Sequence, residues 1–358
     1  MYHSFTPNSL AKALIFGTLC CVNLLSSSVH AKQVDVHDPV MAKEGNTFYV
    51  FSTGPGITFY SSRNLKDWHK EGEVFSSPPA MARQVAPEFA GHLWAPDVQF
   101  HQGKYYLYYS ASAFGKNTSG IGVAVNKTLN PTSPNYQWKD LGTVIQSIPN
   151  RDDWNAIDPN IIEDELGNGW MVFGSFWSGI KMFKLNDDWT RPAEPQEWHN
   201  IAERPRSKTI YTKAASEVTS EIQKNDEVDG AVEGPFIFKK YGYYYLFVSF
   251  DKCCRGKDSN YNIRVGRSNN ATGPYLDKEG KDMRDGGGSL VLAGDAEWVG
   301  LGHNSAYTFD GKDYLVFHAY ETADKYLQKL KVLDMKWDAE HWPKINPKDL
   351  AKYKTTLK

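Results

Sequence analysis

The stretch "HDPVMAKEGNTFYVFST", residues 37–53, contains a polar start, a glycine turn and an aromatic-rich run. The same order returns four more times along the chain. The later copies begin with "WAPDVQF" (94–100), "IDPNIIE" (157–163), "VEGPFIF" (232–238) and "GHNSAYTF" (302–309). Two strand-like runs that flank a short glycine turn are typical of a β-hairpin. Five such hairpins, spaced by roughly 60 to 70 residues, predict a repeat architecture.

Each copy is followed by further strand-like segments, so each unit can supply about four antiparallel strands. We assign the turn glycines as Gly45, Gly103, Gly169, Gly242 and Gly311. Four short strands per unit with a long, regular period are typical of a propeller blade, whereas a sandwich has frequent turns but no long period. Sustained helical periodicity is absent from the sequence. We therefore predict an all-β fold: one five-bladed β-propeller over residues 32–358, with four antiparallel strands per blade.

The segment between the third and fourth copies, "PRSKTIYTKAASEVTSEIQKNDEVDG", fits no repeat. We interpret it as an extra loop that could shape one rim of the propeller.

The first 31 residues have the pattern of a secretory signal peptide. Lys12 precedes the apolar run "ALIFGTLCCVNLL", and Val29 and Ala31 are placed as in a cleavage site. The run is shorter than the roughly 20 residues that a membrane-spanning helix needs. We expect cleavage after Ala31 and a secreted or periplasmic protein without a membrane anchor.

The remaining cysteines, the charge balance and the aromatic content limit the functions that the chain could have. Only Cys253 and Cys254 follow the leader, and they could form a vicinal disulfide or remain two thiols. The 40 basic and 42 acidic residues give no basic surface for a nucleic acid. Aromatic residues reach 14%, which suits both β-sheets and the binding of sugar rings.

A polar residue stands near the start of each copy, on the strand that we expect to be innermost. These residues are Asp38, Asp97, Asp158, Glu233 and His303. Unpaired buried carboxylates are costly, so gathering several at one end of the axis indicates a function, although any single one could cap a turn instead. Two carboxyl groups suffice for glycoside hydrolysis: one protonates the leaving oxygen, and the other activates water or attacks carbon.

At this point the chain resembles the arabinanases of glycoside hydrolase family 43. The resemblance rests on "VHDPV", "LWAPDV", "AIDPNI", "GSFWSGI", "VEGPFI", "SFDKCCRG", "IRVGRS" and "GHNSAY", which follow one another through nearly all of the chain. It implies an inverting mechanism with Asp38 as general base and Glu233 as general acid. Asp158 would orient that acid and raise its pKa.

The resemblance also suggests substrate contacts and an ion. Candidate contacts are Trp94, Phe114, Asn160, Trp177 and Ser178, with His37 beside Asp38. His303 matches a position that holds an ion in such propellers, often calcium with a shell of water. Because calcium prefers oxygen ligands, we expect mostly water around it.

The expected function is hydrolysis of α-1,5-linked L-arabinan by an exported, monomeric, endo-type enzyme. The sequence does not decide between endo and exo action. A β-xylosidase or α-L-arabinofuranosidase of the same family is one alternative, and a non-catalytic carbohydrate-binding propeller is another. The joint presence of three carboxyl groups speaks against the latter.

Overall fold

The computed structural model describes residues 32–205 and 230–358 as a five-bladed β-propeller. The expected signal peptide (1–31) and most of the extra loop (206–229) lie outside the described residues. No helix within the described ranges has the length and apolar character to cross a membrane.

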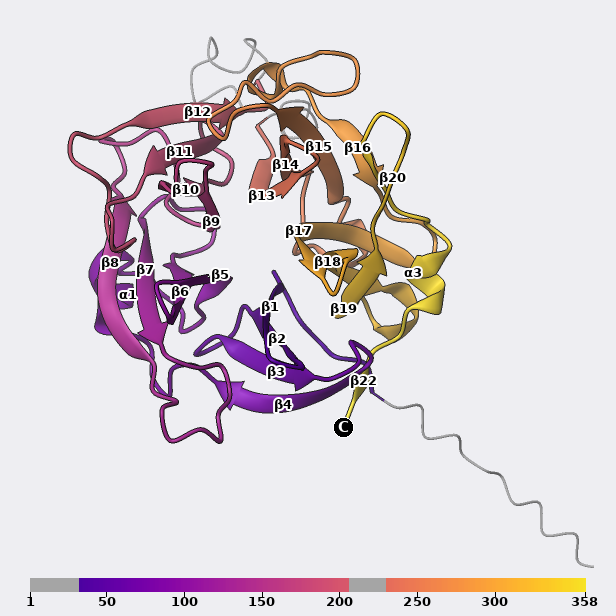
Figure 1. Cartoon of the computed structure of the whole chain (residues 1–358), viewed down its shortest axis with the longest axis horizontal. Helices are drawn as coiled ribbons and strands as arrows, with labels where there is room; N and C mark the ends of the chain where they lie inside the picture. The colour runs from indigo at the N-terminus through magenta and orange to yellow at the C-terminus, as the bar shows by residue number, and fades with distance from the viewer. Residues whose placement is uncertain (1–31, 206–229) are drawn as a thin grey trace, which may run out of the picture. The chain divides into compact units, whose positions relative to one another are not determined.

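Blades 2, 3 and 4 are four-stranded antiparallel sheets, and blade 1 has four antiparallel strands to which a fifth, β22, is added (Figure 1). Blade 1 contains β1 (Val40–Glu44), β2 (Thr47–Ser52), β3 (Thr58–Ser62) and β4 (Asp67–Glu73). Blade 2 contains β5 (Trp94–His101), β6 (Lys104–Ala111), β7 (Ser119–Asn126) and β8 (Lys139–Ser147). Blade 3 contains β9 (Asn160–Glu163), β10 (Gly169–Phe173), β11 (Ile180–Lys184) and β12 (Trp198–Ala202). Blade 4 contains β13 (Val232–Lys240), β14 (Tyr243–Phe250), β15 (Asn262–Ser268) and β16 (Ser289–Leu292).

Blade 5 differs from the expected four-stranded pattern. Its sheet has three strands, β17 (Trp298–Phe309), β18 (Lys312–Glu321) and β19 (Leu327–Asp334). Short elements account for the rest of the regular structure: α1 (Ala80–Val85), β20 (Lys336–Trp337), β21 (Pro343–Lys344), α3 (Asp349–Lys352), β22 (Thr356–Leu357) and the 3₁₀ turns η3 (Gly256–Asp258), η4 (Met283–Asp285) and η5 (Thr322–Asp324).

Both ends of the described chain close the ring of blades. The Leu330 N–H donates to Val34 O at 3.0 Å, and the Val36 N–H donates to Gln328 O at 3.3 Å, so residues 34–36 extend blade 5. At the other end, β22 pairs in parallel with β4 of blade 1. The stretch "VDVHDPV" (34–40) is therefore divided between two blades, because its first half extends blade 5. Only its end leads into β1.

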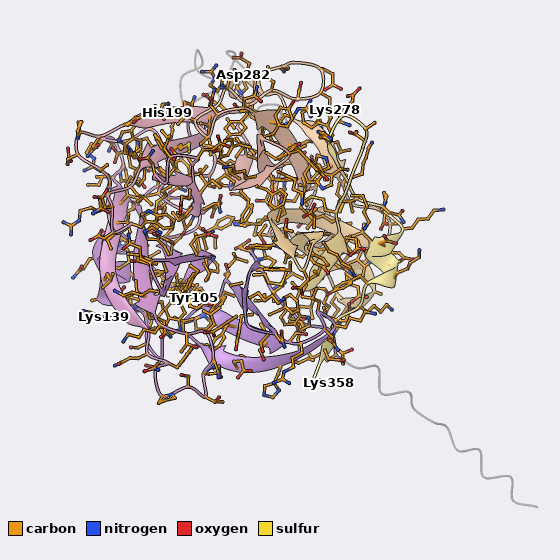
Figure 2. All side chains as sticks on the ribbon, viewed as in Figure 1. Tyr105, Lys139, His199, Lys278, Asp282 and Lys358 are labelled. Carbon is orange, nitrogen blue, oxygen red and sulfur yellow. A yellow bond between two sulfur atoms is a disulfide. The ribbon has the colours of Figure 1, made fainter. Side chains whose placement is uncertain are left out.

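The core lies between the blades, in five buried apolar clusters, one for each neighbouring pair. Alternate residues of a middle strand enter different clusters. In β14, Leu246 and Val248 pack toward blade 3, whereas Tyr245 and Phe247 pack toward blade 5. Burial on both faces explains the continuous aromatic runs of the sequence. Charged side chains such as Lys139 and Lys278 lie at the outer edges of the blades (Figure 2).

The turn glycines confirm four of the five assignments. Gly45, Gly103, Gly242 and Gly311 have positive φ angles between 56° and 78°. In blade 3 the turn residue is Gly167, with φ 81°, not Gly169. Gly169 is the first residue of β10, where a Cβ would lie 2.3 Å from the Trp189 indole nitrogen. It is therefore a close-packing glycine.

A β-bulge stands at the start of the inner strand in blades 2, 4 and 5, and the backbone is unusual at the same place in all five blades. In blade 2, Trp94 and Asp97 lie opposite Ser110 and Tyr108, so one strand carries an extra residue. The residue at this point has a left-handed backbone in each blade: Asp38 (φ 51°), Ala95 (42°), Asp158 (60°), Gly234 (58°) and His303 (48°). We call these five residues the bulge positions, because bulges re-aim side chains and the left-handed backbone recurs at the equivalent place in each blade.

Candidate active site

A ring of hydrogen bonds holds the five bulge positions together. The backbone N–H of each bulge residue is bound by the preceding blade: Ala95 by Thr53 Oγ1 (2.9 Å), Asp158 by Ser110 Oγ (3.1 Å), His303 by Ser249 Oγ (2.8 Å) and Asp38 by His318 Nδ1 (3.1 Å). The residue of blade 3 that corresponds to these acceptors is Gly174, which has no side chain. Blade 3 therefore binds the bulge residue of blade 4 in another way: the Asp158 carboxylate accepts the Gly234 N–H at 3.2 Å. Asp158 is thereby fixed beside the residue that follows Glu233.

Asp38 is 7% exposed and is surrounded by donors. Its Oδ1 lies 2.8 Å from His37 Nδ1 and 3.2 Å from His303 Nδ1. Its Oδ2 accepts from Thr53 Oγ1 at 2.6 Å. The left-handed, pre-proline backbone of Asp38 is unfavourable for a non-glycine residue, and such strain is kept where the surroundings fix a functional group.

These neighbours keep Asp38 ionised. Burial alone would raise its pKa, but His37, His303 and His318 together hold the Asp38 pKa well below its usual range. Burial would lower the pKa of His37, and the Asp38 and Glu233 charges more than offset this, so the His37 pKa is raised. Burial lowers the pKa of His303, and it lowers the pKa of His318 by a larger amount. Asp38 is therefore a carboxylate, and its charge favours the protonated form of His37.

Glu233 begins the inner strand of blade 4, one residue before the bulge. Ser175 Oγ donates to its Oε2 at 2.6 Å, and Tyr261 OH donates to its Oε1 at 2.8 Å. Ser175 comes from the connection after β10, and Tyr261 from the connection before β15. Both carboxyl oxygens of Glu233 are thus positioned by neighbouring elements.

Asp158 is a buried acid beside Glu233, which is partly exposed. Burial, followed by the charges of Glu233 and Asp38, raises the pKa of Asp158 well above its usual range. The site therefore combines an ionised carboxylate, Asp38, with a buried acid, Asp158, whose surroundings favour its protonated form.

Asp97 does not join this group, which corrects our assignment of it to the ring. The bulge position of blade 2 is Ala95, two residues earlier, and Asp97 is 1% exposed. Its Oδ2 accepts the Ile161 N–H at 2.7 Å, while burial raises its pKa to about 6. Asp97 therefore ties blade 2 to blade 3.

Asn160 has the corresponding position in blade 3. Its Oδ1 accepts the Ile237 N–H of blade 4 at 2.8 Å, and its side chain is buried, with Nδ2 3.4 Å from Asp97 Oδ2. The oxygen of this amide binds blade 4, and its nitrogen faces blade 2. We do not include Asn160 among the substrate contacts proposed below.

The other predicted contacts lie on elements near the carboxyl groups. Trp94 stands one residue before the bulge position of blade 2, as Glu233 does in blade 4, and is partly exposed. Trp177 and Ser178 follow Ser175 in the connection to β11, which is tied to blade 4 by the Phe176 N–H bond to Val232 O at 2.9 Å. Phe114, in the loop after β6, is 83% exposed.

Sequence reasoning missed the residues that support the acids: Thr53, Ser110, Ser175, Ser249, Tyr261 and His318. One signal could have found four of them. The aromatic run of four copies ends in a side chain with a polar atom, at Thr53, Ser110, Ser249 and His318. Ser175 and Tyr261 stand in irregular connections, where no periodicity marks them.

His303 fits only weakly as a calcium ligand. Its Nδ1 faces Asp38, and the lowered pKa leaves the ring neutral, so Nε2 could offer a lone pair. A single nitrogen ligand does not make a calcium site by itself, because calcium prefers several oxygen ligands. An ion held there would take most of its ligands from water.

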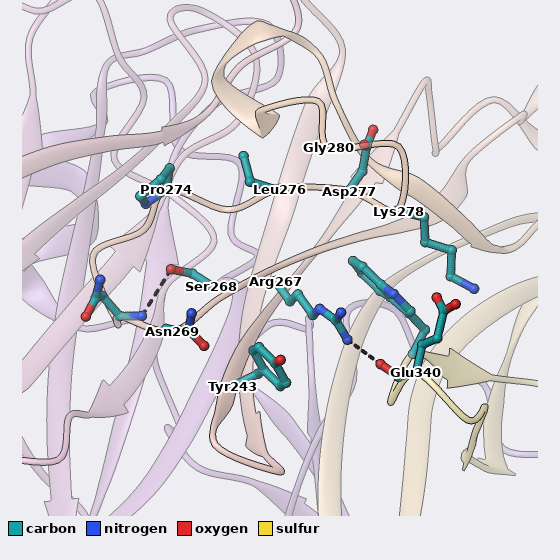
Figure 3. Close-up of a pocket in the computed structure, with 12 residues that line it drawn as sticks. Tyr243, Arg267, Ser268, Asn269, Pro274, Leu276, Asp277, Lys278, Gly280 and Glu340 are labelled. Carbon is teal, nitrogen blue, oxygen red and sulfur yellow. Dashed lines mark hydrogen bonds between the residues drawn. The ribbon is translucent and has the colours of Figure 1, made fainter.

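A separate hollow of about 400 Å³ lies at the other end of blade 4 (Figure 3). Arg267 stacks between Tyr243 and Trp342, at 4.4 and 4.3 Å, and also donates to Glu340 O. Lys278 forms an ion pair with Asp338. The two cations of this hollow, Arg267 and Lys278, are already engaged, so we assign it no role.

Comparisons with known proteins agree with this geometry. Residues 31–343 match the family Glycosyl hydrolases family 43. The extracellular exo-α-(1→5)-L-arabinofuranosidase ArbA of Cellvibrio japonicus is 58% identical over 96% of this chain and 93% of its own length. The extracellular endo-α-(1→5)-L-arabinanase 1 of Bacillus subtilis is 38% identical over 95% of this chain and 96% of its own length.

A solved structure extends the likeness to three dimensions. The α-L-arabinanase of Cellvibrio cellulosa, complexed with arabinohexaose, has a TM-score of 0.84 and 57% identity, covering 91% of this chain and all of that one. Fold, order of motifs and similarity over almost the whole length agree, and the chain belongs to glycosyl hydrolase family 43.

Proposed function

We propose that this protein is an exported enzyme that hydrolyses α-1,5-linked L-arabinan with inversion at the anomeric carbon. The observation that supports this most is the contrast between its carboxyl groups. Asp38 is held ionised by histidines, whereas burial and the nearby charges of Glu233 and Asp38 favour the protonated form of Asp158. Environments that lower the pKa of one carboxyl group and raise that of another suit a general base and a general acid.

In this mechanism Asp38 accepts a proton from the attacking water, and Glu233 protonates the oxygen of the departing sugar. Thr53 and His37 orient the Asp38 carboxylate. Ser175 and Tyr261 orient Glu233. Trp94, Phe114, Trp177 and Ser178 supply aromatic and polar contacts to the arabinose units, with His37 beside the reacting centre.

A calcium ion on the axis remains part of the proposal. It would contact His303 Nε2 and otherwise water, and its charge would further favour ionised Asp38.

We propose that the enzyme releases products from a chain end. The relative with 58% identity is named an exo enzyme. Endo action, which the sequence resemblance suggested, is the second candidate, because the relative with 38% identity is named an endo enzyme.

Product lengths over time test both the substrate and the mode of action. With debranched arabinan, we expect one short product from the first time points, measured by anion-exchange chromatography. A ladder of oligomers at early times would favour endo action. Hydrolysis of aryl xylosides with no release from arabinan would contradict the proposed substrate.

The Asp158→Asn substitution tests the carboxyl pair. The amide oxygen can still accept the Gly234 N–H, so the fold should be kept, which circular dichroism checks. In the wild type, an ionised Asp158 stands as a negative charge near both Glu233 and Asp38. The neutral amide removes that charge, so the proton that the site needs should be lost more easily and the alkaline limb of the kcat/KM profile should move to lower pH. An unchanged alkaline limb would contradict a tuning role for Asp158.

A further inference from the structure

The Cys253–Cys254 disulfide lies between the two halves of the catalytic centre. The structure contains this vicinal bond, one of the two alternatives left by the sequence. Cys253 Sγ is 3.8 Å from Glu233 Oε1, and Cys254 Sγ is 3.5 Å from His37 Nε2. The pair stands in the connection between β14 and β15, which also supplies Tyr261.

The sulfur contacts are packing contacts. A disulfide sulfur carries no hydrogen, so neither sulfur can donate to Glu233 or His37. In the oxidised form these surfaces are apolar and fixed. Two thiols in the same place would instead bring new donors against the acid and against the histidine of the base.

The backbone of Cys254 makes the stronger connection. Its N–H donates to Tyr320 OH at 3.1 Å, and Tyr320 OH lies 2.9 Å from His37 Nε2. The other nitrogen of His37 lies 2.8 Å from Asp38 Oδ1. A continuous chain of hydrogen bonds therefore runs from the Cys254 peptide through Tyr320 and His37 to Asp38.

The disulfide ring holds that peptide in an unusual conformation. Cys254 has φ 64°, a left-handed backbone that non-glycine residues seldom adopt. The bond closes an eight-membered ring that includes the N–Cα bond of Cys254, so φ cannot relax while the ring is closed. Reduction would free φ to return to the ordinary region, and the N–H would turn away from Tyr320.

We propose that the Cys253–Cys254 disulfide is a positioning element of the active site. It orders Tyr320 and His37 around Asp38 through the Cys254 N–H, and it packs against Glu233 through the Cys253 sulfur. This rests on the proposed function, in which Asp38 and Glu233 are base and acid.

Chemical reduction of the full chain is the first test. Tris(2-carboxyethyl)phosphine converts the bond to two thiols while the phosphine takes up the oxygen of a water molecule. We expect kcat on linear arabinan to fall by about 10- to 100-fold, as for a small misplacement of reacting groups, with KM changed less than kcat. Reoxidation should restore the rate. Thiol titration confirms that reduction has occurred.

Two double variants separate the backbone effect from the loss of sulfur. Cys253→Ala/Cys254→Ala should show the same loss without reductant and should not respond to it. Cys253→Ala/Cys254→Gly should recover part of the rate, because glycine adopts the left-handed conformation without the ring. The acidic limb of kcat/KM should move to higher pH in Ala/Ala, since Asp38 loses the ordered His37 that favours its ionised form.

Stability serves as the control, because a disulfide that closes a loop of two residues removes little entropy from the unfolded chain. The midpoint of thermal unfolding should therefore stay within about 4 °C in both variants. Full activity of Ala/Ala, or of fully reduced wild type, would overturn the positioning role. An oxidised wild type without activity on arabinan would instead overturn the proposed function.

Discussion

Replacing Asp38 with alanine is expected to abolish hydrolysis of linear arabinan. Removing a general base typically costs a factor of about 10² to 10⁴ in rate, and this base is the point on which three histidines converge. The charge of Asp38 also favours the protonated form of His37, so the variant disturbs the surroundings of the attacking water as well. Release of reducing sugar measures the loss.

The matched control for this variant is Asp35→Asn. Asp35 lies three residues earlier, where it pairs with Lys329 at 2.6 Å on the closing segment of blade 5. The Asp35→Asn variant should keep its activity within about twofold of the wild-type value. Retained activity in Asp38→Ala would reject Asp38 as the base, and equal loss in both variants would point to the segment as a whole.

Replacing Glu233 with alanine should have an effect that depends on the leaving group. A sugar alkoxide needs a proton as it departs, so activity on arabinan should fall by about 10² to 10⁴. A dinitrophenolate leaves without protonation. The variant should therefore lose far less activity on an arabinobioside of 2,4-dinitrophenol, as measured by release of the phenolate.

Glu163→Gln provides the control for the acid, since Glu163 ends β9 and its side chain is 52% exposed. Both substrates should be cleaved by this variant as by the wild type. If Glu233→Ala lost the same factor on both substrates, its role as a proton donor would be wrong.

The sequence predicted the blade repeat because each blade buries both faces of its middle strands, which leaves aromatic runs at regular spacing. It also predicted Asp38 and Asp158, whose Asp-Pro pairs mark the bulge position. Asp97 misled the interpretation because one polar residue near a repeat start can lie two positions from the bulge. There its side chain serves the next blade's backbone.

The closure of the ring and the support of the acids could not be predicted in the same way. Val34 and Val36 pair with β19, almost 300 residues later, and no local pattern records that partner. Tyr261 and Ser175 contact Glu233 from irregular connections. The contact depends on how three separate segments meet at one end of the axis.

The configuration of the first product tests the central claim most directly. Proton nuclear magnetic resonance of linear arabino-oligosaccharides, recorded before mutarotation, reports the anomer that the wild-type enzyme releases. Water activated by Asp38 on the face opposite Glu233 predicts that the β-anomer appears first and the α-anomer follows as mutarotation proceeds. Initial release of the α-anomer would contradict the account, because it requires a nucleophile where we propose a base.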